Sequence, residues 1–131
     1  MKQVIAYPPN IETIDAAFTV RGKRGIIFAY GDTIYNPDNI IVTESLKAHE
    51  QVHSDRQGKN PDAWWEKYIN VPAFRLNEEI AAHRAEFRQI CQSTKSREER
   101  AKCLQAISTR LASGLYLDMI SPRAARAELQ R

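Results

Sequence analysis

The residues with the clearest chemical potential lie in the segment His49-Glu50-Gln51-Val52-His53. On an α-helix, residues four positions apart lie about 40° apart around the axis and one turn apart in height. Two imidazoles at this spacing can bind one tetrahedral Zn²⁺ ion. The glutamate after the first histidine is rotated by about 100°, off the metal and toward an activated water. The segment therefore predicts a zinc site with His49 and His53 as ligands and Glu50 as general base.

Helical periodicity predicts that this segment faces the interior of the protein. On a helix from about Glu44 to Gln57, both histidines and Glu50 fall on the side that carries Val52, while Lys47 falls on the other side. Two histidines and a carboxylate on a buried face cost free energy unless their charge is compensated. A metal ion would provide that compensation, and ordinary core histidines are the alternative explanation.

A third protein ligand is expected, because catalytic zinc sites generally combine three protein ligands with a water. The helix predicted from about residue 73 to residue 90 places Glu79 at the edge of its apolar face, whereas Glu78 falls on the solvent side. Glu79 is therefore the expected ligand. His83 and, less readily, Glu86 are the alternatives, and a salt bridge from Glu79 to Arg75 or His83 would make Glu79 purely structural.

The elements that must position these residues divide into an extended N-terminal part and a helical body. Val4–Tyr7 and Phe18–Val20 are strand candidates. Two β-rich runs, residues 26–30 and 33–35, flank Gly31-Asp32 and predict a hairpin. The expected fold class is α+β, mostly helical, with a small N-terminal antiparallel sheet packed on a helical body.

Capping signals divide the helical body into five helices. Thr43 and Gly58 bound the first, Ser96 opens a capping box with Glu99, and the long central helix begins at Val71-Pro72. The other expected boundaries are Asn60-Pro61, Ile90, Ser113-Gly114 and Ser121-Pro122. At 131 residues, the chain is expected to form one domain, residues 1–131.

Composition narrows the classes of partner. The formal charge is +3 and the basic residues are scattered, so nucleic-acid binding is not predicted. No apolar run approaches the roughly 18 residues of a membrane span, and the N-terminus does not read as a signal peptide. Cys91 and Cys103 flank a predicted helix–helix turn. Two reduced thiols are the expected state, with a disulfide as the alternative.

The zinc motif, followed by Glu79 after 25 intervening residues, resembles that of the gluzincins, zinc metallopeptidases whose third ligand is a glutamate on a later helix. The closer resemblance is to small single-domain members encoded by bacteriophages and prophages. The resemblance extends from residue 31 to residue 116, about two thirds of the chain, but only the zinc motif and the Glu-x-x-Ala that begins at Glu79 are specific. The residues that carry it are 31–35, 46–53, 56–57, 64–68, 74–76, 78–84 and 111–116.

This resemblance implies a minimal zincin-like fold and a hydrolase that cleaves a peptide or protein substrate by zinc-activated water. His49, His53 and Glu79 would hold Zn²⁺, with Glu50 as the catalytic base and the peptide along a strand such as Thr33–Tyr35. A phage origin implies a location in the host cytoplasm or the virion, with other virion proteins as partners. Many gluzincins carry an aspartate four residues after the glutamate ligand, to orient a metal-bound histidine.

In this chain that position is His83, which leaves open what orients the histidine and whether His83 replaces Glu79. Tyr116, Tyr35 and Arg75 are candidates for stabilising the tetrahedral intermediate. Two other functions remain open. The chain could be a structural virion protein that retains the zinc site without catalysis, or a hydrolase of cell-wall peptides with the same site.

Overall fold

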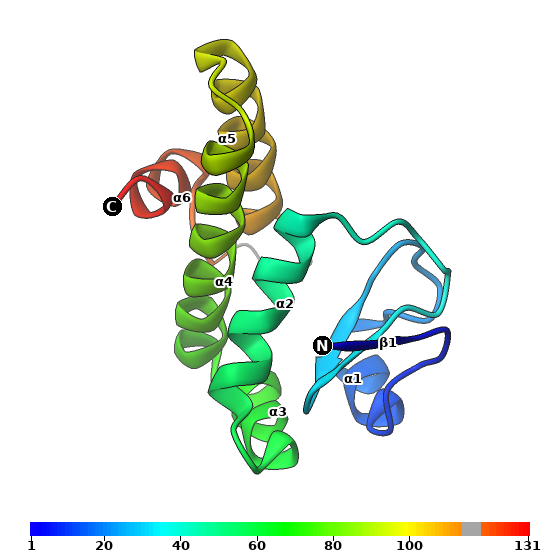
Figure 1. Ribbon diagram of the computed structural model, residues 1–131. Coiled ribbons are helices and arrows are strands. Elements are labelled where there is room, and N and C mark those ends of the chain that lie inside the picture. Colours follow the sequence, from blue (N-terminus) through cyan, green and yellow to red (C-terminus); the bar gives the residue numbers. More distant parts are fainter. Residues whose placement is uncertain (114–118) are drawn as a thin grey trace.

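A computed structural model describes residues 1–113 and 119–131 of the chain. Its centre is a pair of helices that pack side by side, α2 (Glu44–Gln57) and α4 (Pro72–Ser93) (Figure 1). A small sheet and α1 lie beyond α2, whereas α5 and α6 pack against α4. The remaining helices are α1 (Ile11–Phe18), α3 (Pro61–Asn70), α5 (Arg97–Leu111) and α6 (Pro122–Leu129). The mostly helical α+β fold expected from the sequence is therefore confirmed.

The sheet has three short strands in the order β1-β3-β2: β1 (Lys2–Val4), β2 (Phe28–Tyr30) and β3 (Thr33–Tyr35). The predicted hairpin is confirmed, since β2 and β3 are antiparallel around Gly31-Asp32. Gly31 has a φ of 61°, a conformation that glycine adopts without a steric cost. However, β1 runs parallel to β3, so the expectation of a wholly antiparallel sheet is wrong. The long connection through α1 allows this parallel pairing.

The region between β1 and β2 differs most from the sequence-based expectation. Phe18–Val20 is not a strand, because Phe18 is the last residue of α1 and Thr19 ends that helix in a left-handed conformation. The first strand lies at Lys2–Val4 rather than Val4–Tyr7. The helical spacing of Ile11, Ile14 and Phe18 was the signal for α1, because residues three and four apart share one face.

The caps of the other helices follow the sequence signals. The Thr43 hydroxyl accepts a hydrogen bond from the backbone N–H of Leu46 at 3.2 Å, and Gly58 ends α2. The Asn60, Ser96 and Ser121 side chains cap α3, α5 and α6 in the same way. The long helix α4 continues to Ser93, three residues beyond the expected end, and α5 ends at Leu111, just before the predicted Ser113-Gly114 boundary.

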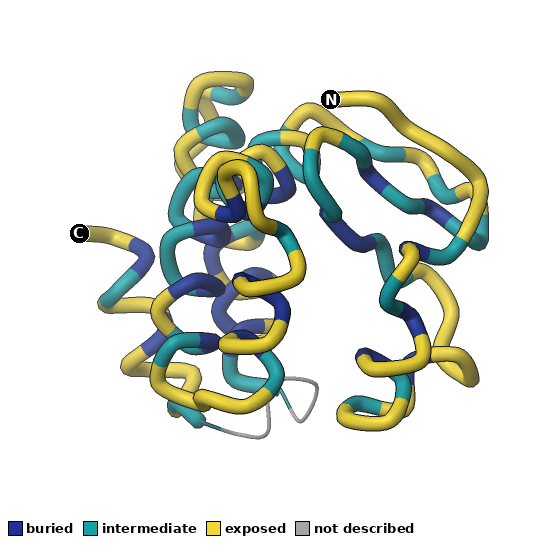
Figure 2. The backbone as a smooth tube through the Cα atoms, turned by 90° about the horizontal axis from the view of Figure 1, so that it is seen from below, coloured by how far each residue is buried: buried dark blue, intermediate teal, exposed yellow. Residues whose placement is uncertain are grey.

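Two apolar clusters lie on opposite sides of the α2–α4 pair, and Figure 2 shows which segments of the backbone are buried. The first is formed by α1, the sheet and α3, and contains Ile11, Ile14, Val20, Phe28, Trp64, Trp65 and Tyr68. The second is formed by α5 and α6 against α4, and contains Leu104, Ile107, Leu111, Ala125 and Leu129. Between them, the buried residues of α2 are all polar: His49, Glu50, His53 and Gln57.

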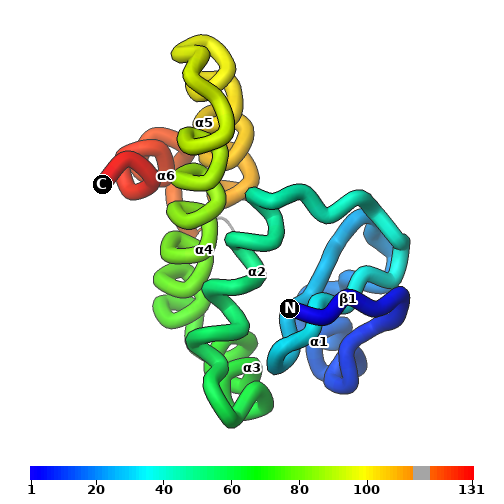
Figure 3. Tube along the Cα trace, in the orientation of Figure 1, coloured from blue at the N-terminus to red at the C-terminus, as the bar shows by residue number. Residues whose placement is uncertain are grey.

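The chain begins at β1, on the side of α2 where the sheet lies, and ends at α6, beyond α4 (Figure 3). Residues 36–43 form the connection that leads from the sheet back to the start of α2. Cys91 and Cys103 are both half-buried free thiols. Within the described part of the chain, no helix combines the length and the apolar character needed to cross a membrane.

Candidate metal centre

The structure brings the three predicted ligands together in the interface between α2 and α4. The Nε2 atom of His53 lies 3.0 and 3.2 Å from the two carboxylate oxygens of Glu79. The Nε2 atom of His49 lies 3.4 Å from the same carboxylate. One ligand atom from each of the three residues falls within 4.8 Å of the others, and all three side chains are buried.

These separations fit a zinc ion. Two ligand atoms bound at about 2.0–2.1 Å to a tetrahedral Zn²⁺ lie about 3.3 Å apart, close to the 3.0–3.4 Å that separates the histidine nitrogens from Glu79. Two imidazoles and one carboxylate are also the donor types that zinc prefers. Without a metal ion, the same contacts are ion pairs between the histidines and the carboxylate.

His49 is held through its other ring nitrogen by Glu86. The Nδ1 atom of His49 lies 3.0 Å from Glu86 Oε1, which is also buried. A proton on Nδ1 donated to Glu86 leaves the lone pair of Nε2 free for a metal. Glu86 therefore orients His49, a role that the sequence analysis did not assign to it.

His83 does not join the group formed by His49, His53 and Glu79. Its Nδ1 atom lies 3.0 Å from Glu86 Oε1, and its ring packs against that of His49 at a centroid distance of 4.4 Å. His49, His83 and Glu86 do form a second cluster of three possible ligand atoms. That cluster lies at the Nδ1 atom of His49. At the Nε2 atoms of His49 and His53, the third possible metal ligand is Glu79.

The buried charges shift the pKa values of this cluster. Burial alone would lower the pKa of His49, but its hydrogen bonds to Glu79 and Glu86 outweigh this effect and raise the pKa to about 10. Burial favours the neutral form of both glutamates, yet the histidines hold the pKa of Glu79 and that of Glu86 well below the usual range. The carboxylates are therefore ionised, as metal ligands and orienting groups must be.

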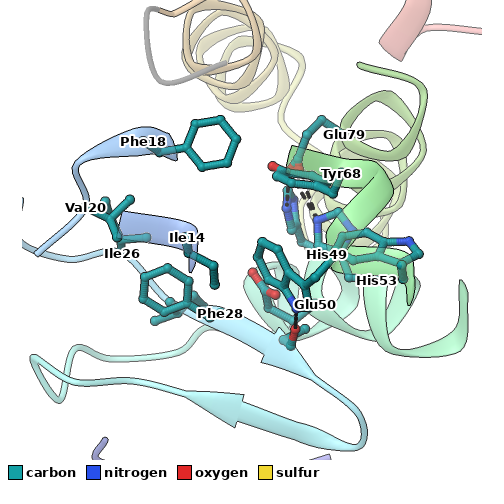
Figure 4. A pocket seen from close by; sticks show the side chains of 14 residues that line it. Ile14, Phe18, Val20, Ile26, Phe28, His49, Glu50, His53, Tyr68 and Glu79 are labelled. Atoms are coloured by element: carbon teal, nitrogen blue, oxygen red, sulfur yellow. Dashed lines mark hydrogen bonds and ion pairs between the residues drawn. The ribbon is translucent and has the colours of Figure 1, made fainter. Parts of the chain in front are cut away.

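Glu50 lies beside this group rather than within it. Burial raises its pKa, although the two histidines of α2 partly oppose the shift. Glu50 lines a cavity of about 90 Å³ together with His49, His53 and Glu79. Figure 4 shows the metal-binding candidates on one side of this cavity and apolar side chains from α1 and the sheet region on the other. Glu50 therefore borders the same space as the three metal-binding candidates.

The cavity wall opposite the histidines is almost entirely apolar. It is formed by the first apolar cluster, which thus serves both as a core and as a lining. The aromatic side also positions His53, whose ring lies 5.2 Å from that of Trp64. The Nδ1 atom of His53 is buried without a hydrogen-bond partner among the described residues. On that side, the His53 ring is therefore held by packing and not by a hydrogen bond. The apolar wall residues are Ile14, Phe18, Val20, Ile26, Ile27, Phe28 and Ala29.

Glu78 departs from its expected position. The prediction that it faces solvent is wrong, because Glu78 is buried and accepts a hydrogen bond from Trp64 Nε1 at 2.7 Å. It also pairs with Arg56. Glu78 thus fixes the aromatic wall of the cavity, whereas its neighbour Glu79 faces the histidines. Both sides of α4 are covered here, by α2 and α3, which periodicity within one helix does not reveal.

Gln57 fixes the sheet against α2, and the sequence analysis did not single it out. Its Nε2 donates to the carbonyl of Ala29 at 2.8 Å, and its Oε1 accepts from the N–H of Gly31 at 2.7 Å. Trp65 Nε1 donates to the same carbonyl of Ala29 at 3.1 Å. Gln57 lies one turn after His53, so the polar stripe of α2 continues beyond the zinc motif. A polar residue on the inward side of the helix, one turn after the motif, was the sequence signal that could have identified Gln57 as buried.

Two further expectations concern the substrate side of the site. Thr33–Tyr35 is not an edge strand, because β3 lies between β1 and β2. The strand nearest α2 is β2. Tyr35 and Arg75 do not line the cavity. Arg75 is buried and donates to the carbonyls of Tyr68 and Ile69 at the end of α3. The third candidate, Tyr116, lies outside the described residues.

Comparisons of the chain with protein-family models, with curated proteins and with solved structures yield no match. The functional assignment therefore depends on the residues and geometry of this chain.

Proposed function

We propose that this protein is a zinc-dependent metallopeptidase. The observation that carries the proposal is the convergence of His49, His53 and Glu79 at separations suited to one zinc ion, with Glu50 beside them on the same cavity. The conjunction of a metal-ligand set and a buried general base at one cavity is typical of metal-assisted hydrolysis.

The roles of the residues follow from their positions. Bound zinc supplies Lewis acidity that activates water for attack on a carbonyl. Glu50 accepts the proton of the attacking water and returns it to the departing amine. Burial raises the pKa of Glu50, which suits a group that must hold a proton between these two transfers. Glu86 keeps His49 in the tautomer that presents Nε2.

The surroundings favour an extended peptide as substrate. Ile26 and Ile27 precede β2 and line the cavity beside Glu50. Within residues 1–113 and 119–131, their backbone groups form no hydrogen bonds, so they can pair with a peptide in β-fashion. A volume of about 90 Å³ corresponds to roughly three water molecules. Its apolar wall therefore suits one aliphatic side chain of modest size next to the scissile bond.

The first test is metal analysis of the purified protein and of its Glu79→Ala and His83→Ala variants. We expect one zinc per chain, lost in Glu79→Ala and retained in His83→Ala, because Glu79 contacts both histidines of α2. Retention in Glu79→Ala with loss in His83→Ala would transfer the ligand role to His83.

The second test is hydrolysis of casein, a peptide panel and purified peptidoglycan by the zinc-loaded protein. The Glu50→Gln variant should retain zinc and its fold but lose at least about 100-fold in rate, since it cannot accept the proton. Digestion of peptidoglycan alone would restrict the substrate to cell-wall peptides. Zinc binding without any hydrolysis would instead favour a structural role.

A further inference from the structure

A second hollow also borders Glu50. Its volume is about 250 Å³, and it shares Ile26, Ile27, His49 and Glu50 with the cavity described above. We call it the Arg110 hollow; its remaining lining residues are Gly25, Ile40, Leu46, His83, Arg110 and Ser113. A peptide that lies along Ile26 and Ile27 therefore borders both the small apolar cavity and this hollow, and Glu50 lines both.

Arg110 is the only arginine or lysine side chain that lines this hollow among the described residues. Its side chain pairs through Nη2 with Glu86 Oε2, and this is the only polar contact of that side chain in the described part of the chain. A guanidinium group has five N–H donors. The side chain is 49% exposed, so the remaining donors are accessible from the hollow.

Glu86 balances the charge of Arg110 only in part. Its carboxylate also accepts from His49 and His83 through the other oxygen, so three groups share one negative charge. Much of the lining on the opposite side is aliphatic: Ile26, Ile27, Ile40 and Leu46. Charge-assisted hydrogen bonds are stronger where apolar walls reduce exposure to water, and guanidinium groups bind carboxylates with defined geometry.

We propose that Arg110 binds a carboxylate of the substrate, so that the site selects a peptide with an acidic group beside the scissile bond. This specificity rests on the proposed peptidase function, because the hollow and the general base share the same wall. The acidic group can be a glutamate or aspartate side chain or the carboxylate that ends a short peptide. Both present the same oxygens to Arg110.

The test compares matched peptides that differ only in charge. In the first set, the two members of a pair carry Glu or its neutral isostere Gln at one position near an otherwise aliphatic cleavage site. There is one such pair for each position, and all these peptides have an amidated C-terminus. A second pair carries a free or amidated C-terminus. We expect kcat/KM to be higher for the charged member of at least one pair by about tenfold, the ratio that corresponds to one charge-assisted hydrogen bond. Equal values in both pairs would overturn the proposal.

Variants of Arg110 test whether this residue causes the preference, measured as the ratio of kcat/KM for the charged peptide to kcat/KM for its neutral partner. In Arg110→Gln this ratio should fall to about one, and in Arg110→Lys it should remain above one because the charge is kept. The ratio is measured within each variant, so a loss of zinc or of folded protein affects both peptides equally and cancels. An undiminished preference in Arg110→Gln would overturn the proposal.

Arg56→Gln is the matched control. Arg56 is also 49% exposed and also pairs with a buried glutamate of α4, but it lies in a groove with Val52 and Arg84 rather than beside Glu50. Its substitution should leave the ratio unchanged. A fall in both variants would mean that general loss of positive charge, not Arg110, sets the preference, and would overturn the assignment.

Binding separates this inference from the proposed function. The zinc-loaded Glu50→Gln variant is titrated with the same peptides by calorimetry. Tighter binding of the charged peptide, lost when Arg110→Gln is added, supports the carboxylate site even if no peptide is cleaved by the unmutated protein. Equal binding of charged and neutral peptides would overturn the site whatever the outcome of the cleavage assays.

Discussion

At the scale of single residues, the imidazole of His49 is the most constrained group of the site. Its Nε2 faces Glu79 and its Nδ1 faces Glu86, while His83 packs against the ring. A metal ion can replace the contact with Glu79, but the contact with Glu86 is compatible with both the metal-free and the metal-bound protein. Glu86 thus determines which nitrogen is presented before any metal arrives.

We expect Glu86→Gln to weaken zinc binding by about tenfold or more, because groups that orient metal-bound histidines typically contribute that much. Competition with a chromophoric chelator measures the change. Glu78→Gln is the matched control, since Glu78 is an equally buried glutamate of α4 that contacts Trp64 and Arg56 instead of a histidine. Equal losses in both variants would contradict an orienting role for Glu86.

Zinc affinity should depend on pH through His49. The two carboxylates raise the pKa of His49 to about 10 in the metal-free protein, so a proton must leave before Nε2 can bind zinc. Apparent affinity should therefore rise by about tenfold for each pH unit between roughly 6 and 8, with one proton released per zinc. Calorimetry in buffers of different ionisation enthalpy counts the protons; no release would show that His49 is already neutral.

The same shift predicts how pH affects the metal-free fold. The pKa of His49 is about 6.5 when unfolded and about 10 when folded, so its ion pairs stabilise the protein fully below about pH 6.5. That contribution is lost as pH rises from there toward 10. We expect urea midpoints of the chelated protein to fall over this range. The His49→Gln variant, also metal-free, should show a smaller fall.

At the scale of elements, the helices from α2 to α6 could be predicted well because their capping signals are local, whereas α1 was missed. Thr43, Asn60, Ser96 and Ser121 each cap the helix that the sequence predicts. Periodicity within α4 also selected Glu79 as the residue that meets the histidines. It misplaced Glu78, because the burial of a helix face depends on how many neighbours surround that helix. The contact of Glu86 with His49 and the position of Arg110 could not be predicted for the same reason, since both depend on how α2, α4 and α5 cross.

The contact between α2 and β2 can be tested at Gln57. We expect Gln57→Leu to lower the free energy of unfolding by about 1–3 kcal/mol, because the half-buried N–H of Gly31 loses its acceptor and the buried carbonyl of Ala29 loses one donor. Urea unfolding measures this loss. Tyr30→Phe removes the exposed hydrogen bond to Asp62 and should cost much less. Similar losses in both variants would rule out a special role for Gln57.

At the scale of the whole molecule, two apolar clusters are joined by an interface that is mostly charged. The residues that α2 and α4 bury toward each other include His49, Glu50, His53, Glu79 and Glu86. Such groups are costly to bury unless they are paired or bind a metal. The interface therefore contributes less to stability than an apolar one of the same size. The same buried polar groups form the proposed metal-binding site.

Removal of the metal should therefore lower the stability of the whole fold. We expect zinc at about 100 times its Kd to raise the melting temperature over that of the chelated protein by roughly 10 °C, since a ligand at that excess contributes about 2.7 kcal/mol. Thermal unfolding followed by circular dichroism measures the difference. The Glu79→Ala variant should melt at the same temperature with and without zinc. A zinc-dependent shift in that variant would place the ion elsewhere.

The engaged carbonyl of Ala29 has a consequence for self-association. A strand at the edge of a sheet invites pairing with a strand from another molecule. Here α2 lies against the outer edge of β2, and Gln57 and Trp65 both donate to that carbonyl. Within the three strands of the sheet, the exposed edge of β1 is then the one left for such pairing. Association strand to strand through the sheet can therefore join two molecules by their β1 edges but cannot grow into a fibre.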